Sequence, residues 1–409
     1  MSAPSHSAFA ALRHRDFRLL WLGQIVSVTG SQMQFVAINW HVYLLTKSAF
    51  ALGLVGLFRG VPIILCSLVG GVVADAVDRK RLMIVTQMVM LTSAALLTAG
   101  TVAGVQSVWP IYILSAFASA ASAFDIPARQ AFMPTLVPAE DFPNAVSLGI
   151  AVFNVATIAG PAIAGILLAE SGPAVIYAIN AISFLAVIAA LIMMRASGNP
   201  ELQSKRSDAL SVAALKEGLR FVWHTPIIVQ TMTLDFAATF FASATLLLPI
   251  FAQERLHVGA RGYGFLAAAP AIGSVLTALL MARLGSFRRQ GRLVVSSVAV
   301  FGVATALFGI STVYWFSLLM LAVTGAADTV STVLRQTIRQ LVTPNHLRGR
   351  MTSINMMFFM GGPQLGELEA GSLAAVIGAP LSVVIGGIGS LVCAAIAAVK
   401  SKSLMEFEM

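Results

Sequence analysis

The chain has 409 residues, of which 58% are hydrophobic and 11% are charged, with a formal net charge of +9. Soluble domains carry about 25% charged residues, so this composition excludes a water-soluble fold and indicates a protein whose solvent is lipid. The positive charge does not indicate a nucleic-acid partner, because the basic residues separate hydrophobic segments and do not cluster in a soluble region.

Twelve hydrophobic segments are long enough to cross a bilayer, which takes about 20 residues as a helix. We predict spans at 17–45, 49–76, 81–104, 108–137, 142–169, 173–195, 226–253, 259–284, 290–311, 314–341, 347–375 and 379–400.

A polar stretch containing Pro200 divides these spans six and six. The predicted organisation is an N-terminal six-helix bundle at 1–195, a cytoplasmic linker at 196–225 and a C-terminal six-helix bundle at 226–409. Apolar residues at helical spacing predict an amphipathic helix on the membrane surface within the linker. An ordinary solvated linker is the alternative.

The basic residues predict the orientation of the spans. If the N-terminus lies inside, every Lys and Arg falls on the cytoplasmic side except Lys47, Arg59, Arg255 and Arg261. This bias predicts that both termini are cytoplasmic.

A short basic turn joins the second and third spans. It reads G-V-V-A-D-A-V-D-R-K-R from Gly71 to Arg81. The length of the apolar runs on both sides predicts a membrane hairpin.

The two halves of the chain are related by an internal repeat at an offset of 206 positions. Under this offset the coinciding pairs are Arg129 and Arg335, Pro138 and Pro344, Ser147 and Ser353, Gly160 and Gly366, Gly165 and Gly371, and Gly53 and Gly259. Parallel repeats of six spans are an architecture of secondary transporters, with the substrate site near the midplane.

The chain resembles the major facilitator superfamily over roughly residues 12–400. Within that superfamily it resembles the drug:proton antiporter-3 and enterobactin-exporter-like group. The stretches that carry the resemblance are F-R-L-L-W-L-G-Q at 17–24, the turn at 71–81, P-A-R-Q-A-F-M-P-T-L-V-P at 127–138, G-P-A-I-A-G at 160–165 and L-V-T-P-N-H-L-R-G-R-M-T-S at 341–353.

The chain also departs from the family pattern. Ala76 and Asp78 stand where the turn usually has a basic residue and a glycine, and the glycine expected soon after Gly160-Pro161 is displaced to Gly165.

The resemblance implies an all-α membrane protein with twelve transmembrane helices in two six-helix pseudo-repeated bundles, the major facilitator fold. It implies a secondary active exporter of a small amphipathic molecule, drug-like or siderophore-like, that works by alternating access in a bacterial inner membrane. We expect a monomer that contacts membrane lipids and a small-molecule substrate. We expect no metal and no cofactor, with the proton gradient as the source of energy.

The resemblance also implies a cytoplasmic gate in the basic turn, formed by Gly71, Asp75, Asp78, Arg79, Lys80 and Arg81. Asp75 lies near the inner end of its span, where a carboxylate can face basic side chains or the positive end of a helix and release them when the halves move. A fixed charge at a helix end is the alternative.

Charged residues deep in the spans are further candidates, because they are costly in lipid and need partners. Arg59 lies about 15 Å from the outer surface, at 1.5 Å per residue. Glu367 and Glu369 lie at a similar depth, so we expect Arg59 to pair with one of them, or else to extend toward water. Asp235 lies near mid-membrane, where an unpaired carboxylate favours its neutral form and is a proton-coupling candidate. A structural aspartate is the alternative.

Polar residues nearer the cytoplasmic side form a second group. Asp125 and Arg129 are one turn apart, so we expect them to pair. Arg335 follows Asp328 by about two turns, too far for such a pair. We interpret all four as elements of a cytoplasmic-side gate, and binding of substrate is the alternative for the two acids.

Three further residues are candidates for lining a central cavity: Gln34, Asn39 and Asn154. Hydrogen bonds between helices are the alternative for them. Gly160 and Pro161 predict a bend in the fifth span.

Other functions remain open at this level. An importer, or a transporter of lipids or metabolites, can use the same fold. A membrane-embedded enzyme is disfavoured because the six histidines are scattered along the chain. The sequence contains no G-x-x-x-x-G-K-[ST] loop, so it gives no sign of ATP-driven transport. A non-transporting sensor has no need for intramembrane charges.

Overall fold

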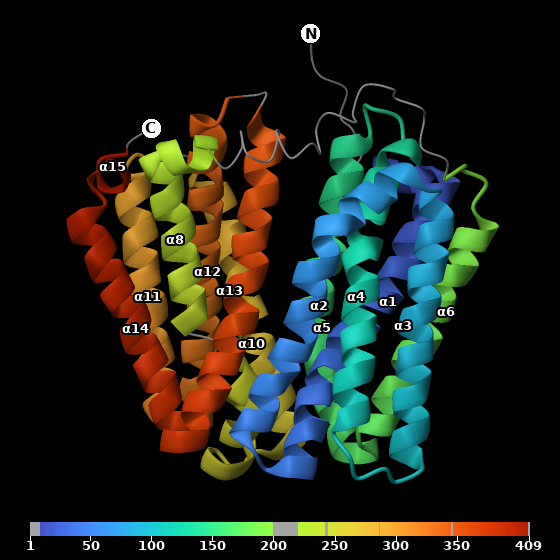
Figure 1. The fold of residues 1–409 in the computed structure, drawn as a ribbon, viewed down its shortest axis with the longest axis horizontal. Coiled ribbons are helices and arrows are strands. Elements are labelled where there is room, and N and C mark those ends of the chain that lie inside the picture. Colours follow the sequence, from blue (N-terminus) through green and yellow to red (C-terminus); the bar gives the residue numbers. More distant parts are fainter. Residues whose placement is uncertain (1–8, 199–219, 242–243, 286, 345–346, 408–409) are drawn as a thin grey trace. The chain divides into compact units, whose positions relative to one another are not determined.

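A computed structural model of the chain describes residues 9–198, 220–241, 244–285, 287–344 and 347–407. These residues form helices and no β-strand (Figure 1). The long helices are α1 (Arg15–Thr46), α2 (Ala49–Ala76), α3 (Arg79–Val102), α4 (Trp109–Phe132), α5 (Phe142–Ser171), α6 (Pro173–Met193), α8 (Pro226–Phe241), α10 (Gly259–Leu284), α11 (Gln290–Ile310), α12 (Tyr314–Val342), α13 (Arg348–Ile377) and α14 (Ala379–Lys400).

Short helical elements complete the described chain. They are η1 (Ala10–Arg13), η2 (Met133–Thr135), η4 (Ala244–Leu247), α9 (Leu248–Ile250), the π-helix η5 (Phe251–Arg255) and α15 (Lys402–Met405). Most of the predicted linker helix falls on 199–219, outside the described residues, and residues 220–224 are helical.

Within the described residues, ten helical segments are long and apolar enough to cross a membrane. One of them runs from Pro226 to Arg255 and joins α8 to the short elements that follow it. The remaining long helices, α1 and α13, carry more polar side chains, among them Gln34, Asn39 and Glu367. The prediction of an all-α membrane protein is confirmed, and the predicted spans match the observed helices closely.

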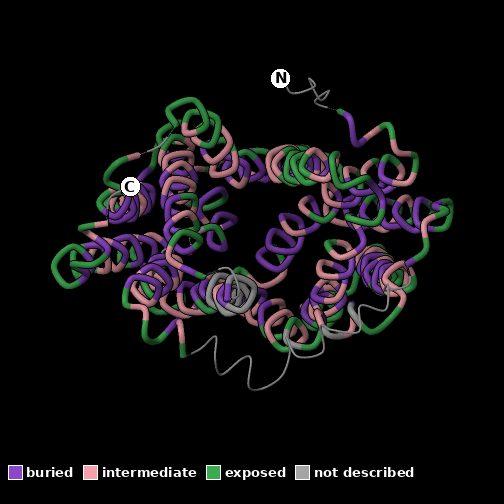
Figure 2. Tube along the Cα trace, turned by 90° about the horizontal axis from the view of Figure 1, so that it is seen from above, coloured by how far each residue is buried: buried purple, intermediate pink, exposed green. Residues whose placement is uncertain are grey.

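Large apolar side chains are exposed along the outer faces of the helices, as lipid contact requires. Examples are Leu65, Phe117, Ile182, Leu276, Trp315 and Val399. In water such an area of exposed apolar surface would be unstable. Buried residues lie on the faces where helices pack against one another (Figure 2).

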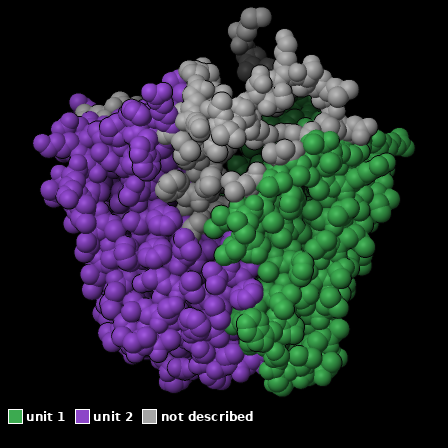
Figure 3. All heavy atoms as spheres, viewed as in Figure 1, with its two compact units in different colours: residues 1–41, 61–203 green, residues 42–60, 204–409 purple. Residues whose placement is uncertain are grey.

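The chain divides into two compact units (Figure 3). Unit 1 comprises residues 1–41 and 61–203, and unit 2 comprises residues 42–60 and 204–409. The segment 42–60, which holds the end of α1 and the first part of α2, therefore groups with the later helices.

In unit 1, α3 packs against α4 and α6, and α5 packs against α6. Gly160 of α5 allows α1 to come close, because an added methyl group would lie 2.6 Å from the Cβ of Gln32 and 3.1 Å from the carbonyl oxygen of Thr29. The apolar core of this unit includes the buried side chains of Phe17, Met83, Phe132 and Leu191.

In unit 2, α11 packs against α12 and α14, α8 packs against α13 and α14, and α10 packs against α12. One of its core clusters includes the buried side chains of Ile228, Val294, Ile338 and Leu404. This packing brings the polar residues of α8, α12 and α13 into one interior.

Candidate functional site

A buried ion pair joins α8 to α12 inside unit 2. The Arg335 guanidinium nitrogen Nη2 lies 2.7 Å from Oδ1 of Asp235. Asp235 is 3% exposed and Arg335 is 1% exposed. The Asp235 carboxylate is therefore paired, as the structural alternative requires, and its proton-coupling role stays a prediction. Two opposite charges this deep are held because each offsets the cost of removing the other from water.

Thr332 extends this ion pair to a second carboxylate. Nη2 of Arg335 donates to the hydroxyl oxygen of Thr332 at 3.1 Å, and the Thr332 hydroxyl hydrogen-bonds with Asp328. Arg335 also attracts Asp328 electrostatically. The sequence spacing placed these two charges too far apart for simple pairing, and the structure links them through the hydroxyl one turn after Asp328.

A second arginine on α12 lies beside the same group. Nη1 of Arg339 donates to Oδ1 of Asn355 on α13 at 2.6 Å, and Arg339 interacts electrostatically with Arg335 and Asp235. We call Asp235, Asp328, Thr332, Arg335 and Arg339 the unit 2 charge cluster. Its two acids and two arginines sum to zero charge when all are ionised.

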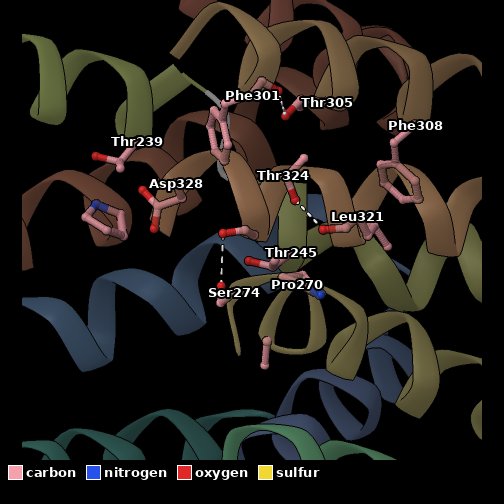
Figure 4. Close-up of a pocket in the computed structure, with 13 residues that line it drawn as sticks. Thr239, Thr245, Pro270, Ser274, Phe301, Thr305, Phe308, Leu321, Thr324 and Asp328 are labelled. Carbon is pink, nitrogen blue, oxygen red and sulfur yellow. Dashed lines mark hydrogen bonds between the residues drawn. The ribbon is translucent and has the colours of Figure 1, made fainter. Parts of the chain in front are cut away.

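A pocket of about 240 Å³ opens beside this cluster within unit 2 (Figure 4). Its walls come from α8, η4, α10, α11, α12 and α13. The residues that line it include Thr239, Thr245, Ser274, Thr305 and Thr324, the aromatic rings of Phe301 and Phe308, and the carboxylate of Asp328. A recess of about 10 Å³, enough for about one water molecule, connects Thr239, Phe301 and Asp328 to Arg335.

Small residues bring α10 and α12 together along one side of the pocket. A methyl group on Gly325 would overlap the carbonyl of Pro270, and one on Gly273 would overlap the carbonyl of Ala322. Close backbone approach through glycine is a common way for helices to associate in lipid. The Ser274 hydroxyl fixes this contact by donating to the carbonyl oxygen of Gly325 at 3.0 Å.

A second charged contact in unit 2 joins α2 to α13. Arg59 and Glu367 attract each other electrostatically. Glu367 fits there because α2 has no side chain at Gly56, where an added methyl group would lie 2.5 Å from Oε2 of Glu367. An added methyl group on Gly60 would lie 2.5 Å from the Cβ of Gln364, and one on Gly53 would lie 3.2 Å from the Cα of Gly371, both on α13. Of the two acids predicted for Arg59, Glu367 is therefore the one that faces it, and Glu369 is half-buried on the same helix.

The basic turn at 71–81 is anchored within unit 1. Asp78 caps the N-terminus of α3, because its Oδ1 accepts a hydrogen bond from the backbone N–H of Arg81 at 2.9 Å. Arg79 Nη1 donates to the carbonyl oxygen of Ala131 at 3.0 Å, and Lys80 Nζ donates to that of Met194 at 2.7 Å. These contacts tie the turn to the ends of α4 and α6.

The remaining members of the predicted gate are Asp75, Gly71 and Arg81. Asp75 lies in α2, but its side chain falls outside the described part, so its latch role stays a prediction. Gly71 has open space around its Cα, and Arg81 is exposed.

Asp125 and Arg129 do not form the predicted pair. Oδ1 of Asp125 accepts hydrogen bonds from Thr86 at 3.1 Å and from Gln87 at 3.0 Å. Arg129 donates to the side-chain carbonyl of Gln24 on α1. The pair fails because Asp125 is turned toward α3 and Arg129 toward α1, although both lie on α4.

The cavity candidates lie inside unit 1. Gln34 accepts a hydrogen bond from Asn180 of α6 at 2.8 Å. This is a hydrogen bond between helices, the alternative to a cavity-lining role. Asn39 is 1% exposed, and Asn154 is half-buried on α5. Pro161 lies inside α5, directly after the glycine that meets α1.

Two features of unit 2 had no counterpart among the predicted residues. The pocket hydroxyls carried no signal, since serine and threonine are common in membrane helices. The hydroxyl of Tyr43 donates to Oε1 of Glu254 at 2.6 Å. Glu254 lies in the π-helix η5, and π-helices often occur at functional sites. No sequence pattern indicated this π-helix, so it was recognised only in the structure.

Comparison with known proteins assigns the chain to a family. The chain matches the family model of transmembrane secretion effectors over residues 6–408. It is 26% identical over 379 residues to the enterobactin exporter EntS of Shigella boydii serotype 18, covering 93% of this chain and 90% of the exporter. It is 25% identical to the enterobactin exporter EntS of Escherichia coli O81, again over 379 residues and with the same coverage.

Solved structures show the same fold. A transporter of the POT family in complex with a thioalcohol-conjugated peptide superposes with a TM-score of 0.75 at 11% identity, covering 96% of this chain and 97% of that one. A bacterial homologue of the iron transporter ferroportin in an inward-facing state superposes with a TM-score of 0.67 at 16% identity, covering 93% and 98%. The family match over nearly the whole length settles the class: this multi-pass membrane protein belongs to the transmembrane secretion effectors of the major facilitator superfamily, which are secondary transporters and not enzymes.

Proposed function

We propose that the protein exports a small amphipathic molecule, drug-like or siderophore-like, from the cytoplasm across the inner membrane by alternating access. Two observations support the direction and the cargo. The matching family is described as secretion effectors, and relatives that align with 93% of the chain are named enterobactin exporters.

The proton gradient drives this export, and the unit 2 charge cluster is where protons are exchanged. The observation that carries this proposal is the ion pair between Asp235 and Arg335, which links through Thr332 to Asp328. A buried ion pair is weak evidence of stability but is costly to break on one side only. Protonation of either carboxylate removes its charge, weakens its hold on Arg335 and changes the preferred arrangement of α8 and α12.

Both termini lie in the cytoplasm in this proposal, and the protein works as a monomer surrounded by lipid. The support for the orientation is the distribution of basic residues, of which all but four fall on one side of the predicted spans. No metal or organic cofactor takes part.

Transport by inverted membrane vesicles tests the function. ATP hydrolysis first acidifies the interior of vesicles that contain the protein. Enterobactin and a panel of amphipathic drugs are then added outside, with and without a protonophore. The proposal expects at least one compound to accumulate inside the vesicles and the protonophore to abolish that accumulation. Accumulation without a gradient contradicts proton coupling. Accumulation only in right-side-out vesicles supports an importer instead.

Site-directed variants connect the result to the charge cluster. Asp235→Asn should abolish gradient-driven accumulation. Glu140→Gln is the matched control, because Glu140 is an exposed acid in the connection after η2, and this variant should transport normally. If Asp235→Asn transports as well as Glu140→Gln, a coupling role for Asp235 is contradicted.

A further inference from the structure

Most of the hydroxyl groups that line the unit 2 pocket donate their hydrogens to backbone carbonyl oxygens. Thr239 donates to the carbonyl oxygen of Asp235 at 2.8 Å, and Thr305 donates to that of Phe301 at 2.9 Å. Thr324 donates to the carbonyl oxygen of Leu321 at 2.7 Å, and Ser274 donates to that of Gly325 at 3.0 Å (Figure 4).

A hydroxyl that donates its hydrogen to a backbone carbonyl keeps two lone pairs as acceptors. Thr305, Thr324 and Ser274 therefore present acceptors to the pocket, and the carboxylate of Asp328 adds another acceptor. A ligand that also presents only acceptors leaves its polar atoms unpaired in a buried place, which weakens its binding. The lining consequently selects for O–H or N–H donors.

The walls of the pocket add a requirement for an apolar ring. Phe301 and Phe308 line it, and Phe308 is held in place by packing against Phe251 at a centroid distance of 4.6 Å. Ligand pockets for whole drug-sized molecules occupy about 300–1,000 Å³. At about 240 Å³, this pocket is sized for one ring-bearing group of a larger molecule.

We propose that the unit 2 pocket is a subsite for an aromatic group with hydrogen-bond donors, such as a dihydroxyphenyl or arylamine group, and that the Asp328 carboxylate anchors the donors. This inference rests on the proposed function, since it assigns the group to the cargo. It gives Asp328 a role in binding instead of the gate role expected from the sequence.

The same arrangement explains how a bound group reaches the ion pair. A donor bound to Asp328 shares the carboxylate with the Thr332 hydroxyl, and Thr332 is in turn bonded to Arg335. A group in the pocket is therefore connected to the ion pair of Arg335 and Asp235 through Asp328 and Thr332. Anionic ligands are disfavoured, because they place a like charge next to Asp328.

Equilibrium dialysis of the purified full-length protein in detergent tests the subsite with small probes. Radiolabelled catechol and benzylamine supply O–H and N–H donors, 1,2-dimethoxybenzene keeps the ring without donors, and benzoate supplies an anion. The proposal expects saturable binding of catechol, benzylamine or both, and at least tenfold weaker binding of dimethoxybenzene and benzoate. Binding of all four probes with similar affinity overturns it, and so does binding of none.

Two variants locate the binding in the pocket. Thr324→Val removes one acceptor with little change of shape and should weaken donor binding about fivefold, the effect of losing one hydrogen bond worth about 1 kcal/mol. Thr329→Val is the control, because Thr329 donates to the carbonyl oxygen of Gly325 on the same helix but does not line the pocket. Equal effects of the two variants overturn the assignment.

Asp328→Asn should weaken binding at least tenfold, and its melting temperature in detergent shows whether it is folded. If it does not fold, Thr324→Val and the donor-free probe still decide the question. The outcomes also separate the two proposals. Specific catechol binding without transport in vesicles contradicts the export proposal and leaves the subsite intact. Gradient-driven transport without donor-specific binding contradicts the subsite and leaves the export proposal intact.

Discussion

Asp235 and Arg335 meet at 2.7 Å although 100 positions separate them in the chain, and both are almost completely enclosed. Removing one partner leaves an uncompensated charge inside the membrane, which typically costs about 3–5 kcal/mol. We expect Asp235→Asn and Arg335→Gln each to lower the melting temperature of the purified protein. The double variant should recover part of the loss, because neither charge remains.

A double-mutant cycle measures the coupling between these two residues, since interacting pairs depart from additivity by about 0.5–3 kcal/mol. Additive effects of the two substitutions would show that the ion pair contributes nothing to stability. Transport should stay absent in the double variant even where stability returns, because the proposed coupling works through the hold of the carboxylates on Arg335, which this variant lacks.

The contact between Arg59 and Glu367 predicts a rescue by charge exchange. Arg59→Glu and Glu367→Arg should each abolish vesicle transport, because each variant places two like charges deep in unit 2. The combined exchange should restore a measurable fraction of transport. Glu369→Gln provides the control on the same helix and should change transport little. Normal transport by Arg59→Ala would contradict a role for the pair.

The glycines of α2 predict opposite effects of one substitution at two positions. Gly56→Ala should destabilise the protein by about 1–3 kcal/mol through overpacking, because the added methyl group would press on Glu367. Gly71→Ala, on the same helix, meets nothing within 4 Å and should be neutral or stabilise α2 by up to about 1 kcal/mol. Melting temperatures in one detergent compare them directly. Equal destabilisation at both positions would argue against close packing at Gly56.

The N-cap of α3 predicts a modest loss of stability without a change of fold. Asp78→Ala removes the acceptor for the Arg81 N–H and should cost about 1 kcal/mol. Asp78→Asn keeps a capping oxygen and should cost less. Hydrogen exchange of the amides at the start of α3 measures the effect locally. No difference between the two variants would show that capping is not what Asp78 contributes.

The helices could be predicted from the sequence because one physical signal fixes them. Lipid demands about 20 apolar residues per span, and polar residues mark the ends. Depth along a helix follows from the residue count, so Arg59 could be matched to the level of Glu367 and Glu369, but the choice between the two acids came from the structure. The linker between the halves stood out by its polarity.

The side-chain partners of the charged residues could not be predicted in the same way. The spacing of Asp125 and Arg129 on one helix predicted a pair, but each side chain found a partner on another helix, at Gln87 and Gln24. Helix spacing says which residues share a helix face and does not say which neighbouring helix covers it. The partner of Asp235 was missed for the same reason.

The pocket was hidden from the sequence for a different reason. Its serine and threonine residues are common in membrane helices. Their hydroxyl groups act as acceptors because each one donates its hydrogen to a backbone carbonyl of its own or a neighbouring helix, which only the structure shows. Thr332 gave no signal either, although it connects two charged groups that the spacing had separated.

The paired arginines of the internal repeat have partners of different charge. Arg129 and Arg335 occupy the same place in the two halves, yet Arg129 reaches a neutral amide on α1 and Arg335 reaches a carboxylate on α8. The two halves are therefore electrically unequal at one matched position. The amide partner carries no charge at any pH, whereas the carboxylate partner loses its charge on protonation, so acid weakens the attraction at only one of the two arginines.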